Sequence, residues 1–165
     1  MTDFTIEHGL PHLALSVASQ SYAVSAVSVM EIVLLQPITP LPTMPSCLLG
    51  LMNLRGTVIP IIDLGEKLGF GPTTFTPRTC AIVVMTRVDN IPTLIGVIAD
   101  EVLDVVSLSP ADIGPPPAFG SPVSVAYLSG ITRIDDRYVL ILDFTKILSL
   151  EELLAVSREK EGATA

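Results

Sequence analysis

Cysteine and basic residues are scarce in this chain of 165 residues, and each scarcity excludes a class of protein. The two cysteines, Cys47 and Cys80, have no CxxC spacing, so the sequence predicts neither a disulfide framework nor a zinc site. No lysine or arginine precedes Arg55, and the basic stretch that opens a signal peptide is therefore missing. We expect a protein of the reducing cytoplasm.

Long apolar runs are missing as well. A transmembrane helix needs about 20 consecutive apolar residues, and the best stretch, Tyr22–Leu35, is interrupted by serines and by Glu31. The formal net charge of −8 repels phosphate backbones and anionic lipid headgroups. The sequence therefore predicts no nucleic-acid binding and no direct membrane insertion.

Short β-branched runs separated by Gly, Pro, Asp and Asn make up most of the chain, and fourteen prolines disfavour long helices through its middle. These features predict a mainly β protein. At the end of the chain, a capping box at Ser149-Leu-Glu-Glu152 with leucines at helical spacing predicts a C-terminal helix. The predicted strands are Leu13–Val17, Tyr22–Ser25, Val29–Leu35, Leu51–Leu54, Thr57–Asp63, Cys80–Thr86, Thr93–Ala99, Val102–Leu108, Val125–Ile134 and Arg137–Leu142.

An internal repeat appears when the chain is shifted by 80 positions, without a gap. Gly50 then falls on Gly130 and Asp63 on Asp143, and each copy has the pattern of a hairpin followed by a short helical turn. The repeat predicts one domain over residues 1–165, made of two β units of about five strands each. Units of this size would close into small barrels that hide their sheet edges, with a groove between them.

Two charged residues stand out by their isolation. Arg55 is the first cation of the chain, and Glu31 is the only acid between Glu7 and Asp63. Both have apolar sequence neighbours, where an unpaired charge would be costly, so we expect them to pair. Two interpretations stay open: a structural ion pair that fixes how two strands cross, or a docking surface that includes Arg55.

Candidate catalytic and metal-binding residues are few. His8 and His12 have a proline between them, which disfavours a helix that would direct both towards a metal. Cys80 lies in an apolar predicted strand, where a thiol is a small buried hydrophobe. The acids at positions 100–104 lack the spacing of a calcium-binding loop. We therefore predict no catalytic residue, no cofactor and no metal.

Several motifs occur in an order and spacing that resemble a known family. They are Val29-Met-Glu-Ile32, Gly50-Leu-Met-Asn-Leu-Arg-Gly-Thr-Val-Ile-Pro-Ile-Ile-Asp-Leu64, Gly96-Val-Ile-Ala-Asp-Glu-Val102, Leu128-Ser-Gly-Ile131 and Val139-Leu-Ile-Leu-Asp143. Over nearly its whole length the chain resembles the CheW-like chemotaxis coupling proteins. The run around Asn-Leu-Arg-Gly, with Glu-Ile upstream, is the most specific part of the match.

The resemblance implies two SH3-like β-barrel subdomains in tandem and a non-catalytic adaptor role. Proteins of this family couple chemoreceptors to a histidine kinase of the CheA type, in the cytoplasm at membrane-associated receptor arrays. The groove between subdomains receives the receptor's hairpin tip, and one barrel packs against the kinase's regulatory domain. By motif, the expected partner-binding residues are Val29, Glu31, Ile32, Asn53 and Arg55.

Two residues depart from the family's pattern. Gly65 stands where a basic residue is common, and Ala26 is small where a larger β-branched residue is usual. An adaptor of a twitching-motility or biofilm pathway therefore stays open as an alternative. A small ligand-binding or enzymatic β-barrel is the remote alternative, and it predicts a deep polar pocket with convergent titratable groups.

Overall fold

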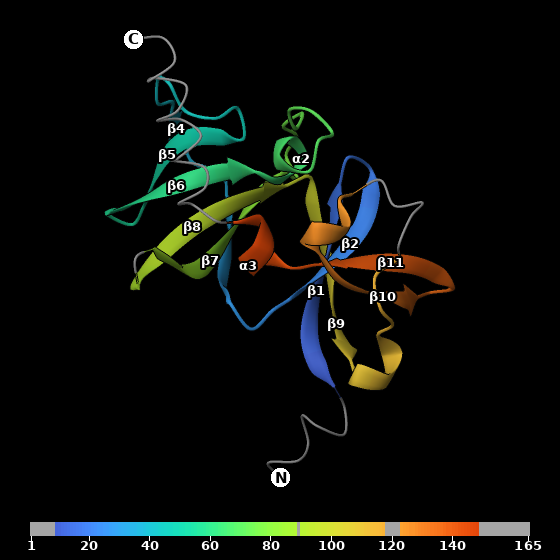
Figure 1. Ribbon diagram of the computed structural model, residues 1–165. Helices are drawn as coiled ribbons and strands as arrows, with labels where there is room; N and C mark the ends of the chain where they lie inside the picture. The colour runs from blue at the N-terminus through green and yellow to red at the C-terminus, as the bar shows by residue number, and fades with distance from the viewer. Residues whose placement is uncertain (1–8, 89, 118–122, 149–165) are drawn as a thin grey trace.

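The computed structural model describes residues 9–88, 90–117 and 123–148, which form two β-sheets with short helical turns (Figure 1). The C-terminal helix predicted from Ser149 onward lies outside these residues. The elements are β1 (Leu10–Val17), β2 (Gln20–Ser25), β3 (Val29–Leu34), β4 (Ile38–Thr39), β5 (Leu48–Leu54), β6 (Thr57–Asp63), α2 (Leu64–Lys67), β7 (Cys80–Val88), β8 (Ile91–Ala99), β9 (Glu101–Leu108), η1 (Pro110–Asp112), η2 (Val125–Tyr127), β10 (Leu128–Ile134), β11 (Arg137–Leu142) and α3 (Phe144–Ile147).

The mainly β class is confirmed, and several boundaries differ from the prediction. The predicted strand Val125–Ile134 is a 3-10 turn, η2, followed by β10, because the Ser124 side chain accepts a hydrogen bond from the N–H of Ala126 and starts a helical turn. The two-residue strand β4 was not predicted, since it lies within a proline-rich stretch. Strand β5 begins three residues earlier than expected.

Strands from both ends of the chain share one sheet. The five-stranded sheet has the order β10-β11-β2-β1-β9, and the six-stranded sheet has the order β3-β7-β8-β6-β5-β4. In each sheet one parallel pair joins two antiparallel hairpins: Ile61 pairs with Gly96 in one, and Ile141 with Ala23 in the other. The hairpin β10–β11 therefore takes as its parallel partner a strand from the beginning of the chain.

The prediction of closed five-stranded barrels is corrected by this topology. In the described ranges one sheet has six strands, and neither sheet has a ladder between its two end strands. Short segments pair there instead of a closing ladder. The two residues of β4 pair with β5, and Gly114 makes a single bridge to Ile131 of β10. Prolines follow both of these segments, and a proline cannot donate to a longer ladder.

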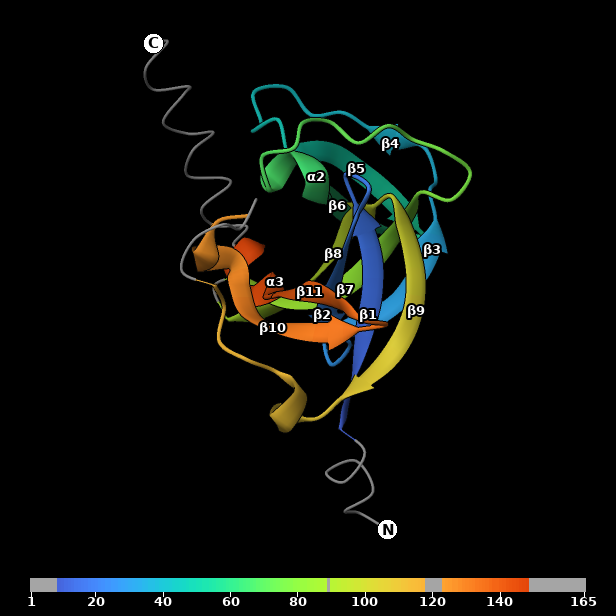
Figure 2. The ribbon, with the colours of Figure 1, turned by 90° about the vertical axis from the view of Figure 1, so that its right-hand side faces the viewer.

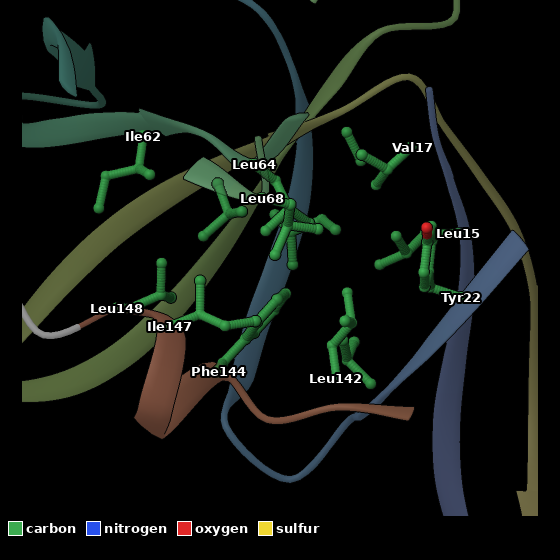
Figure 3. Packing of buried hydrophobic residues seen from close by; sticks show 14 of the residues in the cluster. Leu15, Val17, Tyr22, Ile62, Leu64, Leu68, Leu142, Phe144, Ile147 and Leu148 are labelled. Atoms are coloured by element: carbon green, nitrogen blue, oxygen red, sulfur yellow. The ribbon is translucent and has the colours of Figure 1, made fainter. Parts of the chain in front are cut away.

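The largest apolar cluster lies between the two sheets, and we call it the shared core (Figure 3). Leu15 and Tyr22 enter it from the five-stranded sheet, Ile62 from the six-stranded sheet, and Phe144 from α3. Each sheet also encloses a smaller cluster, around Ile61 in one and Ile141 in the other. The shared core fills much of the space between the units and holds them together. Its members are Leu13, Leu15, Val17, Tyr22, Val24, Cys47, Leu48, Ile62, Leu64, Leu68, Ile82, Val84, Ile95, Val97, Ala99, Val123, Leu128, Leu142, Phe144, Ile147 and Leu148.

Candidate partner-binding site

The β5–β6 turn presents Arg55 at the tip of a hairpin. Arg55 and Gly56 both have positive φ angles, of 50° and 89°, as in the two-residue turns that match the twist of paired strands. The Asn53 side-chain oxygen accepts a hydrogen bond of 2.7 Å from the N–H of Gly56. This bond fixes the turn, and the turn fixes where the arginine side chain begins.

Arg55 binds Glu31 of β3 through both guanidinium nitrogens. Nη1 donates to Oε2 at 3.0 Å, and Nη2 donates to Oε1. The hydrogen bond from Arg55 lowers the pKa of Glu31, and the bond to Glu31 raises the pKa of Arg55. Both side chains are charged at neutral pH, and the paired geometry is the one that matches a planar guanidinium to a carboxylate.

The predicted pairing of Glu31 with Arg55 is confirmed, but the reason given for it was wrong. The Arg55 side chain is 69% exposed and that of Glu31 is 32% exposed, so burial does not force the two charges together. Strand β3 and the β5–β6 hairpin lie towards opposite ends of the six-stranded sheet order. The pair therefore joins the two ends of a curled sheet at the surface, where a partner can reach it.

Ile32 points away from the ion pair. Glu31 lies opposite Val83, which belongs to the core of the six-stranded sheet, whereas Ile32 lies opposite Ile82, which belongs to the shared core. Val29 also packs against the shared core, and Ile32 is 43% exposed beside it. Glu31 therefore lies on the side of the cluster that the six-stranded sheet encloses, whereas Val29 and Ile32 lie on the side of the shared core. Asn53 alternates with Met52 and Leu54 of the enclosed cluster and lies near the tip of the hairpin that carries Arg55.

Strand β9 repeats the arrangement of β3, and the sequence analysis did not find this. Asp104 lies opposite Ala14 of β1 just after a register shift, as Glu31 lies opposite Val83 of β7. Val102 then corresponds to Val29 and packs against the shared core, and Val105 corresponds to Ile32 and is 60% exposed. Figure 2 shows β3 and β9 on the same side of the molecule, at the right of the view.

A sequence signal for β9 was present. The segment Val29-Met-Glu-Ile-Val-Leu-Leu35 matches Val102-Leu-Asp-Val-Val-Ser-Leu108 in residue type at every position except Leu34, which falls on Ser107. The shift of 80 positions that aligns the hairpins does not align these two strands, because the connections after them differ in length. A second shift would have shown Val105 as a counterpart of Ile32.

A hollow of about 340 Å³ lies where β2, the β2–β3 link and α3 meet. Its apolar lining includes Val24, Val27, Leu142 and Phe144, and the imidazole of His12 also lines it. Within the described ranges, no group of three or more His, Cys, Asp or Glu side chains is placed to hold a metal ion. Asp143, Thr145 and three serines also line the hollow, so apolar and polar side chains are mixed there.

The two departures from the family's pattern lie away from the ion pair. Gly65 is buried in α2, where an added Cβ would meet the Thr73 hydroxyl at 3.0 Å. Ala26 lies in the β2–β3 link, and its N–H donates to the Pro11 carbonyl at 3.0 Å. No helix of the described residues is long and apolar enough to cross a membrane.

Two β-sheets around a shared core, with an ion pair and exposed apolar side chains at the surface, define a two-sheet β domain. Comparison with known proteins gives the family. The model of the CheW-like domain matches residues 11–152, and the chain belongs to this family. The match covers most of the chain and includes both sheets.

Relatives and a solved structure agree with the family match. The probable chemotaxis protein CheW of Rhizobium etli is 33% identical over 140 residues, which cover 85% of this chain and 88% of the relative. The chemotaxis protein CheW of Klebsiella aerogenes is 30% identical over 148 residues, covering 90% and 87%. The crystal structure of the scaffolding protein TtCheW from Thermoanaerobacter tengcongensis matches with a TM-score of 0.72 and 29% identity, over 83% of this chain and 87% of that one. These findings support a coupling adaptor role in chemotaxis signalling.

Proposed function

We propose that this protein joins chemoreceptors to a CheA-type histidine kinase through two separate faces and catalyses no reaction itself. The observation that carries the proposal is the split across β3: Glu31 points to the hairpin tip, and Ile32 points to the side of the other sheet. Successive side chains of a strand point to opposite faces, so a single strand serves both contacts. The adaptor is recruited from the cytoplasm to receptor arrays by these partners.

The kinase face consists of Glu31, Arg55, Asn53 and the exposed Val58 beside them. Val58 lies opposite Asn53 across the hairpin and is 60% exposed. The ion pair holds the arginine in one geometry before a partner arrives, which reduces the entropy lost on binding. Charges at the edge of a contact steer the encounter, and an apolar residue between them supplies buried area.

The receptor face consists of Ile32 and Val105, with Val29 and Val102 beside them. The outer two side chains are exposed, and the inner two pack against the shared core. An apolar surface on a rigid core suits the helical hairpin tip of a chemoreceptor, because a helix docks by residues three and four positions apart. The charge of −8 favours a tip that is not strongly acidic.

The kinase face is tested by Arg55→Glu, with kinase and receptor binding measured separately by calorimetry. We expect kinase affinity to fall about thirtyfold or more, the size of a hot-spot loss, and receptor affinity to stay unchanged. Arg133→Glu is the matched control, because Arg133 forms an exposed ion pair of 3.2 Å with Asp136 on the corresponding hairpin. Unchanged kinase binding by a folded Arg55→Glu variant contradicts the proposal.

The receptor face is tested by Ile32→Asp and Val105→Asp. Each places a charge on an apolar contact, so we expect weaker binding of the receptor tip with kinase binding preserved. A swap of the ion pair, Glu31→Arg with Arg55→Glu, separates the two interpretations of the pair. Restored kinase binding by the swap would show that only the link between strands matters, and lost binding would show that Arg55 contacts the kinase.

A further inference from the structure

The hollow where β2, the β2–β3 link and α3 meet contains a buried ring with a free nitrogen. His12 lines this space of about 340 Å³ and is only 6% exposed. Its Nδ1 lies 3.0 Å from the carbonyl oxygen of Leu10. A carbonyl oxygen only accepts hydrogen bonds, so Nδ1 carries a hydrogen and donates it. Nε2 of the neutral ring then has a lone pair, and no described residue donates to it.

Nε2 is open to the hollow. In the described ranges, the Tyr22 hydroxyl is the only side-chain polar atom that is fully buried and has no hydrogen-bond partner. Nε2 of His12 has no partner there either, so this nitrogen keeps contact with solvent although most of its residue is covered. The hollow is the space that the ring lines. A donor that enters the hollow would therefore satisfy this acceptor.

Asp143 presents a second acceptor to the same hollow. Its Oδ1 accepts hydrogen bonds from the N–H and the hydroxyl of Thr145, and these bonds cap α3. Among the described residues, its Oδ2 has only a loose contact of 4.0 Å with Nζ of Lys146, whose side chain is 52% exposed. Oδ2 therefore keeps most of its capacity to bind a second cation.

The rest of the lining suits an alkyl chain. Val24, Leu142 and Phe144 are buried and form apolar walls, and the exposed Val27 lies on the same hollow. No lysine or arginine of the described ranges lines it. Apolar walls next to acceptor atoms match an amphipathic cation, because the alkyl stem packs on the walls while the charged group meets the acceptors.

We propose that this space, which we call the His12 hollow, binds a primary ammonium group on a short alkyl stem. An ammonium group has three donors, and Nε2 of His12 and Oδ2 of Asp143 are acceptors without a close donor. The formal net charge of −8 attracts cations to the protein. The volume of about 340 Å³ lies within the range of small-ligand sites, which is about 300–1,000 Å³. The ligand is therefore a short amine or the side chain of a lysine.

The His12 hollow is separate from the two proposed partner faces. None of the residues assigned to the kinase face or to the receptor face lines it. The inference therefore goes beyond the proposed function and does not rest on it.

The first probe is n-butylammonium, added to the full chain and followed by NMR of the methyl groups of Val24, Val27 and Leu142. We expect saturable shifts with a dissociation constant of about 1 mM, a value within the limit for so small a ligand. Butyrate has the same stem with a carboxylate and should cause no saturable shift. The neutral n-butanol should bind at least about fivefold more weakly than the ammonium. No saturable shift with n-butylammonium, or equal binding by butyrate or n-butanol, overturns the proposal.

Two variants test the two acceptors. His12→Phe keeps a ring and removes both nitrogens, and Asp143→Asn removes the charge while its amide oxygen still caps α3. We expect n-butylammonium to bind about tenfold more weakly to the first variant and about fivefold more weakly to the second. Asp104→Asn removes an exposed charge of β9, away from the hollow, and is the control for general attraction of cations. Unchanged binding by the first two variants, or an equal loss in the control, overturns the proposal.

The ring nitrogens of His12 give a measurement in the unaltered protein. Nitrogen-15 NMR distinguishes a ring nitrogen that carries a hydrogen from one that has a lone pair. The chain has two histidines, and the spectrum of His12→Phe assigns their signals. We expect a hydrogen on Nδ1, a lone pair on Nε2, and a shift of the Nε2 signal as n-butylammonium binds. A hydrogen on Nε2 of the free protein, or an Nε2 signal that saturating probe leaves unchanged, overturns the proposal.

A further probe separates a free amine from a lysine of a partner protein. Nα-acetyl-lysine methylamide presents the same ammonium stem on a peptide backbone. Binding as tight as that of n-butylammonium assigns the His12 hollow to a lysine side chain, and exclusion of this derivative alone assigns it to a free amine. Either result supports an ammonium site, whereas binding by neither probe refutes it.

Discussion

Replacement of Tyr22 by phenylalanine should stabilise the protein. Tyr22 is 1% exposed in the shared core, and its hydroxyl has no hydrogen-bond partner among the described residues. A buried polar group without a partner costs about 1–3 kcal/mol, and phenylalanine keeps the ring while it removes the group. We expect the free energy of unfolding to rise by about 1 kcal/mol and the melting temperature by about 2–4 °C for a domain of this size.

The assay is urea and thermal unfolding at neutral and at alkaline pH. Burial raises the pKa of Tyr22 above 10.0, so the folded protein holds the phenol proton to higher pH than the unfolded chain does. The contribution of this protonated phenol to the free energy of unfolding is therefore fully present below about pH 10, and it is lost as the pH rises towards the folded pKa. The Tyr22→Phe variant should lose less stability over this range. A variant less stable at pH 7, with the same alkaline loss, would show that the hydroxyl has a partner and that the reasoning is wrong.

Further predictions concern a close approach, a pair of helix caps and the ion pair. Gly50→Ala should prevent folding or cost more than about 4 kcal/mol, because an added Cβ would collide with the backbone carbonyl of Thr39. Gly56→Ala should lower the free energy of unfolding by only about 1–2 kcal/mol, because its Cβ would meet no atom within 4 Å and only the positive φ of 89° is unfavourable. Asp63→Ala should lower unfolding free energy by about 2–3 kcal/mol, since this buried carboxylate caps α2 and accepts 2.8 and 2.5 Å bonds from Thr73. Replacement of the partly exposed cap Asp143 by alanine should lower the free energy of unfolding by about 1 kcal/mol. Kinase binding should stay constant from pH 7 to pH 5, because Arg55 holds the pKa of Glu31 below 4.5, and it should weaken only as that carboxylate takes up a proton.

Urea unfolding checks the two glycines and the two caps, and calorimetry at several pH values checks the ion pair. Equal losses for Gly50→Ala and Gly56→Ala would contradict the close approach at β4. Equal losses at the two caps would show that the Thr73 bonds add nothing. A fall in kinase affinity already between pH 7 and pH 5 would assign the binding to another titrating group.

The parts of the fold that were predicted well are those with local patterns. The hairpins β5–β6 and β10–β11, each with a helical turn after an aspartate, lie at the two places that the repeat aligned. Turn residues and alternation of side chains are encoded within a few positions, so a single sequence shows them. The strand Thr57–Asp63 was predicted with the bounds that the structure has.

The parts that were missed depend on contacts between distant segments. Nothing local in β2 shows that it pairs in parallel with β11, and this pairing places the first strands in the same sheet as the last. Barrel closure was predicted from the strand count, whereas the prolines after β4 and near Gly114 leave each sheet with a short bridge. The side of β3 on which Ile32 lies depends on a register shift after Val29, which periodicity alone does not show.

The most direct test of the adaptor account is titration of the protein with a CheA-type kinase in the presence of a saturating chemoreceptor hairpin fragment. Two faces on opposite sides of β3 predict that the three proteins form one complex, and that Arg55→Glu removes the kinase while the receptor fragment stays bound. Displacement of one partner by the other, or failure to bind either, would contradict the account.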